Sequence, residues 1–157
     1  MIDSGPKLFL NGGYYYRHLG QLSLNLSVAK TITDAGWHEY LEGTFALSRE
    51  FHEAPKVSLV AFIHAHPNAG QRRATAEFVS RNEIPPIERI AVLTDSQLLR
   101  GAMVAFSWVM PKSNLRAFKG SEYGTALAWL REVATFDEAR AKAAWVEACA
   151  QLKVTPR

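Results

Sequence analysis

The sequence predicts an α/β protein built on a mixed β-sheet of about five strands, with helices packed on the sheet and an additional helix at the C-terminal end. The first observation is the stretch 88–118, ERIAVLTDSQLLRGAMVAFSWVMPKSNLRAF, which has the pattern of a strand, a helix and a second strand. A unit of this length joins parallel strands by a right-handed crossover. The second observation is that strand and helix patterns alternate along the rest of the chain, so helices covering a sheet are expected.

Extended segments open the chain and should pair as antiparallel strands. Residues 7–10 and 14–19 are the first two, with Gly12-Gly13 as a bend or bulge between them. Gly20-Gln21 suits a tight turn. In residues 22–27 leucines alternate with serine and asparagine, which is typical of a half-buried strand.

Two helices and the strongest strand follow. A helix is expected over about 33–53. Thr33 or Asp34 can cap its start, and it should end before Pro55, which disfavours helical geometry at the preceding residue. Residues 57–64, VSLVAFIH, are apolar on both faces, which places this strand in the centre of the sheet. The next helix is expected over about 68–82, where Asn68 and Gln71 resemble a capping box.

The C-terminal third continues the alternation. Strands are expected at 89–93 and 115–118, on either side of a helix that Pro111 ends. A helix follows Ser121, and Thr135 with Glu138 resembles a capping box for the last helix. The apolar side of that last helix is expected at Ala139, Ala143, Val146 and Ala150.

Composition limits the class of protein. With 157 residues, 48% hydrophobic and 21% charged, the chain is expected to form a single domain over 1–157, with its core at about 7–132 and the last helix at about 135–152. No apolar run approaches the about 20 residues of a membrane span. The N-terminus MIDSGPK lacks the features of a signal peptide, so a cytoplasmic location is expected.

Charge and cysteine content bear on partners. The net charge is +3, with lysines and arginines scattered, so a nucleic-acid partner is not expected. The single Cys149 excludes an internal disulfide and a cysteine-based zinc site.

Five segments together carry a resemblance to a known family. They are ERIAVLTDSQLLRGAMVAFSW, LRAF, ALAWL, ITDAGWHEYL and PNAGQRRATAEFV. Over about residues 7–132 the chain resembles the STAS superfamily of sulfate-transporter and anti-sigma-factor-antagonist domains, and more closely the SpoIIAA-like group. The resemblance implies a STAS-type fold and a non-enzymatic regulatory module that binds a partner protein and needs no cofactor.

The resemblance also points to a phosphorylation switch. In the antagonists, a serine after the central strand is phosphorylated by a partner kinase, and the added charge releases the complex. The corresponding residues here are Asn68-Ala69-Gly70, where the glycine fits the pattern and the hydroxyl is absent. Thr94 and Ser96, after the next strand, are weak candidate phosphoacceptors, and helix capping is the preferred interpretation of both.

The candidate partner or anion surface comprises Asn68, Gly70, Arg72, Arg73 and Arg100. Arg72 and Arg73 lie near the start of a predicted helix, where positive charge opposes the helix dipole and can mark a site for an anion or an acidic partner. Arg100 begins the next predicted helix and could join them in space. The alternative is that both neighbouring arginines are simply solvated.

Histidines and tyrosines offer weaker candidates. His64 and His66, at the end of a predicted strand, would share one face and form a weak alternative metal site, although a pair of loop histidines is favoured and no metal is expected. The run Tyr14–Tyr16 puts aromatic side chains on both faces of a strand, and at least one of them should be exposed. An ordinary strand explains this run equally well.

The sequence favours a binding function. It contains no G-x-S-x-G, phosphate-loop or H-E-x-x-H motif, so an enzyme is not expected. The leading interpretation is a cytoplasmic, STAS-type regulatory module in signalling that binds a protein, with a homodimer also open. The alternative is a Sec14-like binder of a small apolar ligand or lipid, with Met103, Phe106 and Met110 lining the pocket. A cavity of roughly a few hundred Å³ between helix and sheet would favour that alternative.

Overall fold

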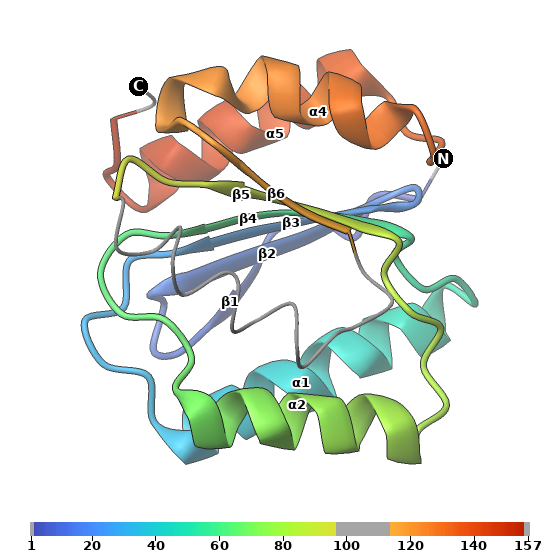
Figure 1. The fold of residues 1–157 in the computed structure, drawn as a ribbon, viewed down its shortest axis with the longest axis vertical. Coiled ribbons are helices and arrows are strands. Elements are labelled where there is room, and N and C mark those ends of the chain that lie inside the picture. Colours follow the sequence, from blue (N-terminus) through green and yellow to red (C-terminus); the bar gives the residue numbers. More distant parts are fainter. Residues whose placement is uncertain (1, 97–113, 156–157) are drawn as a thin grey trace.

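The computed structural model describes residues 2–96 and 114–155, which form a mixed sheet with helices on both faces (Figure 1). The elements are β1 (Lys7–Phe9), β2 (Tyr14–Leu19), β3 (Leu22–Ser27), α1 (Asp34–Glu50), β4 (Val57–Phe62), α2 (Ala69–Arg81), β5 (Arg89–Leu93), β6 (Asn114–Phe118), the 3-10 turn η1 (Gly120–Glu122), α4 (Tyr123–Arg131) and α5 (Glu138–Gln151). The helix expected between β5 and β6, with Arg100 and the Met103, Phe106 and Met110 stripe, lies outside the described residues.

The strands lie side by side in chain order, from β1 to β6. β1, β2 and β3 pair antiparallel, and β3 to β6 pair parallel. Leu19 pairs with Leu22, which confirms the tight turn at Gly20-Gln21. The mixed sheet and the antiparallel opening are therefore as the sequence predicts.

The sheet has six strands where about five were expected. Each of the six strands falls on a segment that the sequence predicts as extended. The chain turns between the first two at Gly12, which has a φ of 86° and follows Leu10 and Asn11, both also left-handed. This turn reverses the chain so that Lys7 pairs with Tyr16 in antiparallel register. The bend expected at Gly12-Gly13, between residues 7–10 and 14–19, is thus a hairpin turn that separates β1 from β2.

Helices cover both faces of the sheet (Figure 1). On one face α1 and α2 enclose a core that includes Trp37, Leu41 and Phe78. On the other face α4 and α5 enclose a second core, which includes Leu127 and Trp145. A side chain at Gly43 of α1 would collide with the ring of Phe9, so glycine permits β1 to approach this helix.

This two-sided cover explains the tyrosine run in β2. Tyr14 and Tyr16 belong to the core under α1, and Tyr15 belongs to the core under α5. Aromatic side chains therefore occupy both faces of the strand, as predicted. All three are buried, so the expectation that at least one is exposed is wrong. The three tyrosines contribute side chains to both cores because helices cover both faces of β2.

The last helix differs from its expected start and orientation. Asp137 caps α5, accepting a hydrogen bond from the Arg140 backbone N–H at 2.9 Å, so the expected Thr135–Glu138 capping box is wrong. The buried side of α5 comprises Ala141, Ala144, Trp145, Ala148 and Cys149. The four residues expected on that side, Ala139, Ala143, Val146 and Ala150, are exposed.

Candidate functional site

A cavity of about 230 Å³ lies between the sheet and helices α1 and α2. Strands β2 to β6 form its floor, and Trp37, Phe45 and Phe78 are among the aromatic side chains of its walls. Its surface is mainly apolar, with a small polar area. Concave apolar surfaces with a few polar groups are the usual form of small-molecule sites.

The floor of the cavity carries a buried polar network. The Asn25 carboxamide oxygen accepts hydrogen bonds from the hydroxyls of Tyr14 at 3.0 Å and Tyr40 at 2.7 Å. The Asn25 amide nitrogen donates to the Oγ atoms of Ser23 at 3.2 Å and Ser58 at 3.0 Å. The Ser23 hydroxyl donates to Ser58 at 2.9 Å, so the network closes on itself.

This network is the site feature that the sequence pattern missed. The alternation in residues 22–27 predicts a strand with its polar side in solvent, whereas Ser23, Asn25 and Ser27 are all buried. Helix α1 covers that side and supplies Tyr40 as a hydrogen-bond partner. Burial raises the pKa of Tyr40 to about 12, so its hydroxyl stays protonated and remains a donor at neutral pH.

The start of α2 borders the cavity through Pro67 and Arg72. It is built by Asn68 and Gln71. The Asn68 side chain accepts from the Gln71 N–H at 2.8 Å, and the Gln71 side chain accepts from the Asn68 N–H at 3.0 Å. This confirms the capping box predicted there. Gln71 also donates to the Ile32 carbonyl at 2.8 Å and to Asp34 at 3.0 Å, which ties the starts of α1 and α2 together.

The structure separates the two neighbouring arginines. Arg72 is half-buried, lines the cavity and donates from Nη1 to the Pro67 carbonyl at 2.7 Å. Arg73 is exposed and makes no ion pair within residues 2–96 and 114–155. Asn68 and Gly70 are exposed beside it, whereas Arg100 lies outside the described residues. Four of the five predicted surface residues are thus gathered at the start of α2.

The candidate phosphoacceptors lie at the end of β5. Thr94 is buried at 7% exposure, and its Oγ1 accepts a hydrogen bond from the Ser96 N–H at 3.1 Å. Ser96 is half-buried. A kinase would have to open this strand end to reach the Thr94 hydroxyl. Phosphorylation at either residue stays a prediction, and so does capping of the helix expected after them.

The two loop histidines do not form a metal site with their neighbours in the described structure. β4 ends at Phe62, so His64 and His66 lie in the following loop and strand alternation does not set their directions. Both are exposed, and His66 lines the cavity. Within residues 2–96 and 114–155 there is no group of three or more His, Cys, Asp or Glu side chains that could hold a metal ion.

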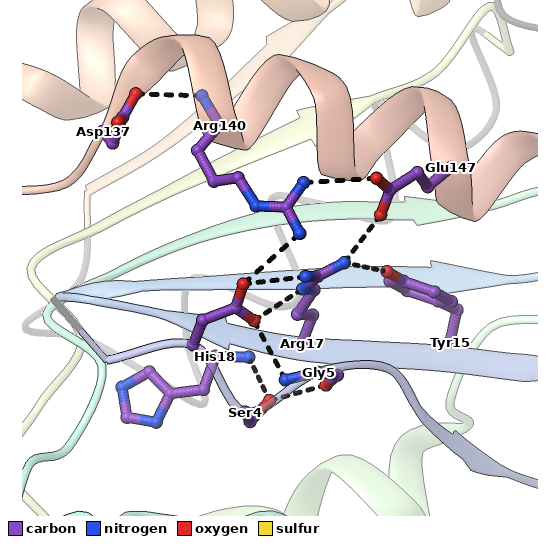
Figure 2. A network of polar contacts seen from close by, with 9 residues as sticks. Ser4, Gly5, Tyr15, Arg17, His18, Asp137, Arg140 and Glu147 are labelled. Atoms are coloured by element: carbon purple, nitrogen blue, oxygen red, sulfur yellow. Dashed lines mark hydrogen bonds and ion pairs between the residues drawn. The ribbon is translucent and has the colours of Figure 1, made fainter.

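A second polar cluster lies on the opposite face of the sheet, under α5 (Figure 2). Arg17 of β2 is 4% exposed and binds both carboxylate oxygens of Asp3, at 2.8 and 2.7 Å. Its Nη1 binds Glu147 of α5 at 2.7 Å. The hydrogen bond from Arg17 lowers the pKa of Asp3 to about 2. The cluster joins the N-terminal segment to α5, which indicates a structural role.

Comparison with known proteins identifies the domain type. A family model described as SpoIIAA-like matches residues 24–131, which is more than half of the chain. The match ends close to the expected residue 132 and begins later than the expected residue 7. No curated protein and no solved structure gives a match. Within the described residues, no helix combines the length and apolar character needed to cross a bilayer.

Proposed function

The chain belongs to the SpoIIAA-like family, and from this premise we propose that it is a regulatory module that acts by binding a protein partner. The family match over residues 24–131 is the observation that carries the proposal. SpoIIAA-like domains of the STAS type are generally non-enzymatic regulatory modules that bind proteins, and the proposal extends this to the present chain. A cytoplasmic signalling role is part of the same proposal.

The proposed binding surface is the exposed start of α2, formed by Asn68, Gly70 and Arg73. Arg73 supports it best, because its guanidinium is exposed and has no ion-pair partner among residues 2–96 and 114–155. Arginine is enriched among the residues that contribute most to protein interfaces, since its fork of donors binds carboxylates in two contacts. A partner with acidic side chains at this position fits the surface.

The test is affinity capture from lysate of the source organism with tagged wild-type protein and two variants. Arg73→Ala removes the proposed contact, and Arg81→Ala is the matched control at the other end of α2. We expect one or two proteins captured in stoichiometric amounts by the wild type and by Arg81→Ala. The Arg73→Ala variant should lose about tenfold in affinity, as expected for removal of a contact worth about 1.4 kcal/mol. Equal capture by both variants would remove this surface from the proposal.

A second candidate function rests on the cavity. Its volume of about 230 Å³ is within the range that would favour a binder of a small apolar ligand or lipid. The cavity lies between the sheet and helices α1 and α2, and a cavity between helix and sheet supports this alternative. The Met103, Phe106 and Met110 contribution to the lining lies outside the described residues and stays a prediction.

Native mass spectrometry of purified protein tests this second function. A copurifying small molecule would add a discrete mass that disappears after organic extraction, and the extract would identify it. A single mass equal to that of the chain, together with no binding of added apolar probes, would contradict it.

A further inference from the structure

Arg72 contributes a charged group to the lining of the cavity. Its side chain belongs to the cavity wall, and one of its donors already binds the Pro67 carbonyl. Among the described residues that line the cavity, Arg72 is the only arginine and there is no lysine, aspartate or glutamate. His66 is the other lining group that can carry positive charge. An anion beside Arg72 would therefore meet no carboxylate from the described wall.

The guanidinium retains donors for a ligand. Arginine carries five N–H donors in a planar fork, and one interaction, from Nη1 to Pro67, is made here. No described carboxylate lies within ion-pair distance of Arg72. A carboxylate is the group that matches this fork, and such a charge-assisted bond is roughly twice as strong as a neutral one.

The remainder of the cavity selects an apolar body. The Asn25 network at its floor is internally paired, so the floor does not need a polar ligand atom to satisfy it. The volume of about 230 Å³ exceeds the roughly 150 Å³ of an apolar cavity that holds benzene, so a chain of about eight carbons is a suitable size. The polar end of such a ligand would then lie at Arg72.

We propose that the cavity binds an apolar monocarboxylic acid of medium chain length, with its carboxylate on the Arg72 guanidinium and its hydrocarbon body between the sheet and α1 and α2. This inference rests on the second proposed function, the binding of an apolar ligand, and adds the chemical class of that ligand. It also assigns Arg72 a role different from that of Arg73, which the sequence treats as its equal.

Isothermal titration with octanoate and 1-octanol tests the proposal, because the two probes share one hydrocarbon chain and differ in charge. Wild type is expected to bind octanoate at least about tenfold more tightly than 1-octanol, as a charge-assisted hydrogen bond implies. Arg72→Gln should lose about tenfold in octanoate affinity and change 1-octanol affinity less than about threefold. Arg73→Gln, outside the cavity wall, is the matched control and should bind both probes as the wild type does.

The outcomes separate the two proposals. If both probes bind equally and Arg72→Gln changes neither, the carboxylate assignment is overturned while apolar-ligand binding remains. If neither probe binds to the folded wild type, the carboxylate assignment and the proposed binding of an apolar ligand are both overturned. Thermal denaturation checks the fold of each variant. Arg72→Lys is the second test, since it keeps the charge but loses the planar fork, and it should bind octanoate with an affinity between those of wild type and Arg72→Gln.

Discussion

His18 is a polar side chain buried without a partner. It is 0% exposed in β2, and neither ring nitrogen has a hydrogen-bond partner in the described structure. Its ring packs edge-on against Phe51, with centroids 6.1 Å apart. Burial lowers the pKa of His18, and the nearby backbone of Gly20 and the charge of Glu53 offset part of this effect. The neutral imidazole is therefore the form that the fold accommodates.

We expect His18 to make the protein less stable in mild acid. Its folded-state pKa lies below the unfolded value of 6.5, so the unfolded chain takes up a proton first as pH falls. Protonation of His18 should not reduce the free energy of unfolding above about pH 6.5. Between the unfolded-state and the folded-state pKa of His18, that free energy should fall by about 1.4 kcal/mol for each pH unit. Urea denaturation of wild type and His18→Leu at pH 7.5 and pH 5 measures the difference.

The His18→Leu variant should lose less stability between these two pH values than the wild type. The matched control is His64→Gln, which removes an imidazole from an exposed loop position and leaves the interior unchanged. An identical pH dependence in wild type and His18→Leu would show that His18 is not the group that titrates.

Asp3 should contribute more than Glu147 to the free energy of unfolding through its contacts with Arg17. Asp3 makes two bonds to the buried guanidinium, whereas Glu147 makes one and is 51% exposed. Asp3→Asn should cost about 2 kcal/mol in the free energy of unfolding at pH 7, and Glu147→Gln less than about 1 kcal/mol. Urea denaturation of both variants measures this order. Equal losses would contradict a principal role for Asp3.

The Asp3 contribution also has a defined pH window. The pKa of Asp3 falls from 3.8 to about 2 in the folded protein. The unfolded chain therefore protonates first, and the stabilisation is present above about pH 3.8 and lost as pH falls through about 2. This window lies well below that of His18, so the two groups can be distinguished by titration.

Sequence patterns cannot identify these buried polar residues in advance. Arg17, Ser23 and Asn25 have residue types that are usually exposed, and only the placement of a helix over each face makes them interior. For Asn25 the decisive partner, Tyr40, is on a helix that follows later in the chain. Asn68 and Arg73 lie together at the start of α2 because they are near neighbours in sequence, and their role as a partner surface stays a prediction.

At the scale of the element, the cap of α2 gives the sharpest expectation. Asn68→Ala removes the side-chain acceptor for the Gln71 N–H and should cost about 1 kcal/mol of stability. Asn68→Ser should retain most of it, because a serine hydroxyl also caps helices. Thermal denaturation compares the two variants. A loss as large in Asn68→Ser as in Asn68→Ala would show that capping is not what Asn68 contributes.

The two expected capping boxes show what decides a helix start. At Asn68 both bonds of the box form within four residues, so the local pattern is sufficient. At Thr135 a distant residue intervenes, because the Thr135 N–H donates to the Gln21 side chain at 2.9 Å and its carbonyl accepts from the Gln21 N–H at 3.2 Å. Asp137 then provides the cap. Long-range contacts of this kind are invisible to a local pattern.

At the scale of the whole molecule, α5 is part of the core although the family match ends at residue 131. Trp145, Ala148 and Cys149 belong to the same buried cluster as Tyr15 and Leu24 of the sheet. The sequence predicts the helix but gives the wrong face, because alanines occur all around it and define no unique apolar stripe. Only packing against the sheet selects the face that carries Trp145.

We propose that α5 and the sheet unfold as one cooperative unit. Substitutions at two adjacent residues of α5, one buried and one exposed, test this proposal. Trp145 is 3% exposed and Val146 is 44% exposed. Trp145→Ala should cost about 3–5 kcal/mol, while Val146→Ala should change stability by less than about 0.5 kcal/mol. Urea denaturation followed by far-UV circular dichroism and by fluorescence should give coincident transitions in both variants. An early, separate loss of helical signal in Trp145→Ala would instead make α5 an independent appendage, because the sheet would then remain folded without it.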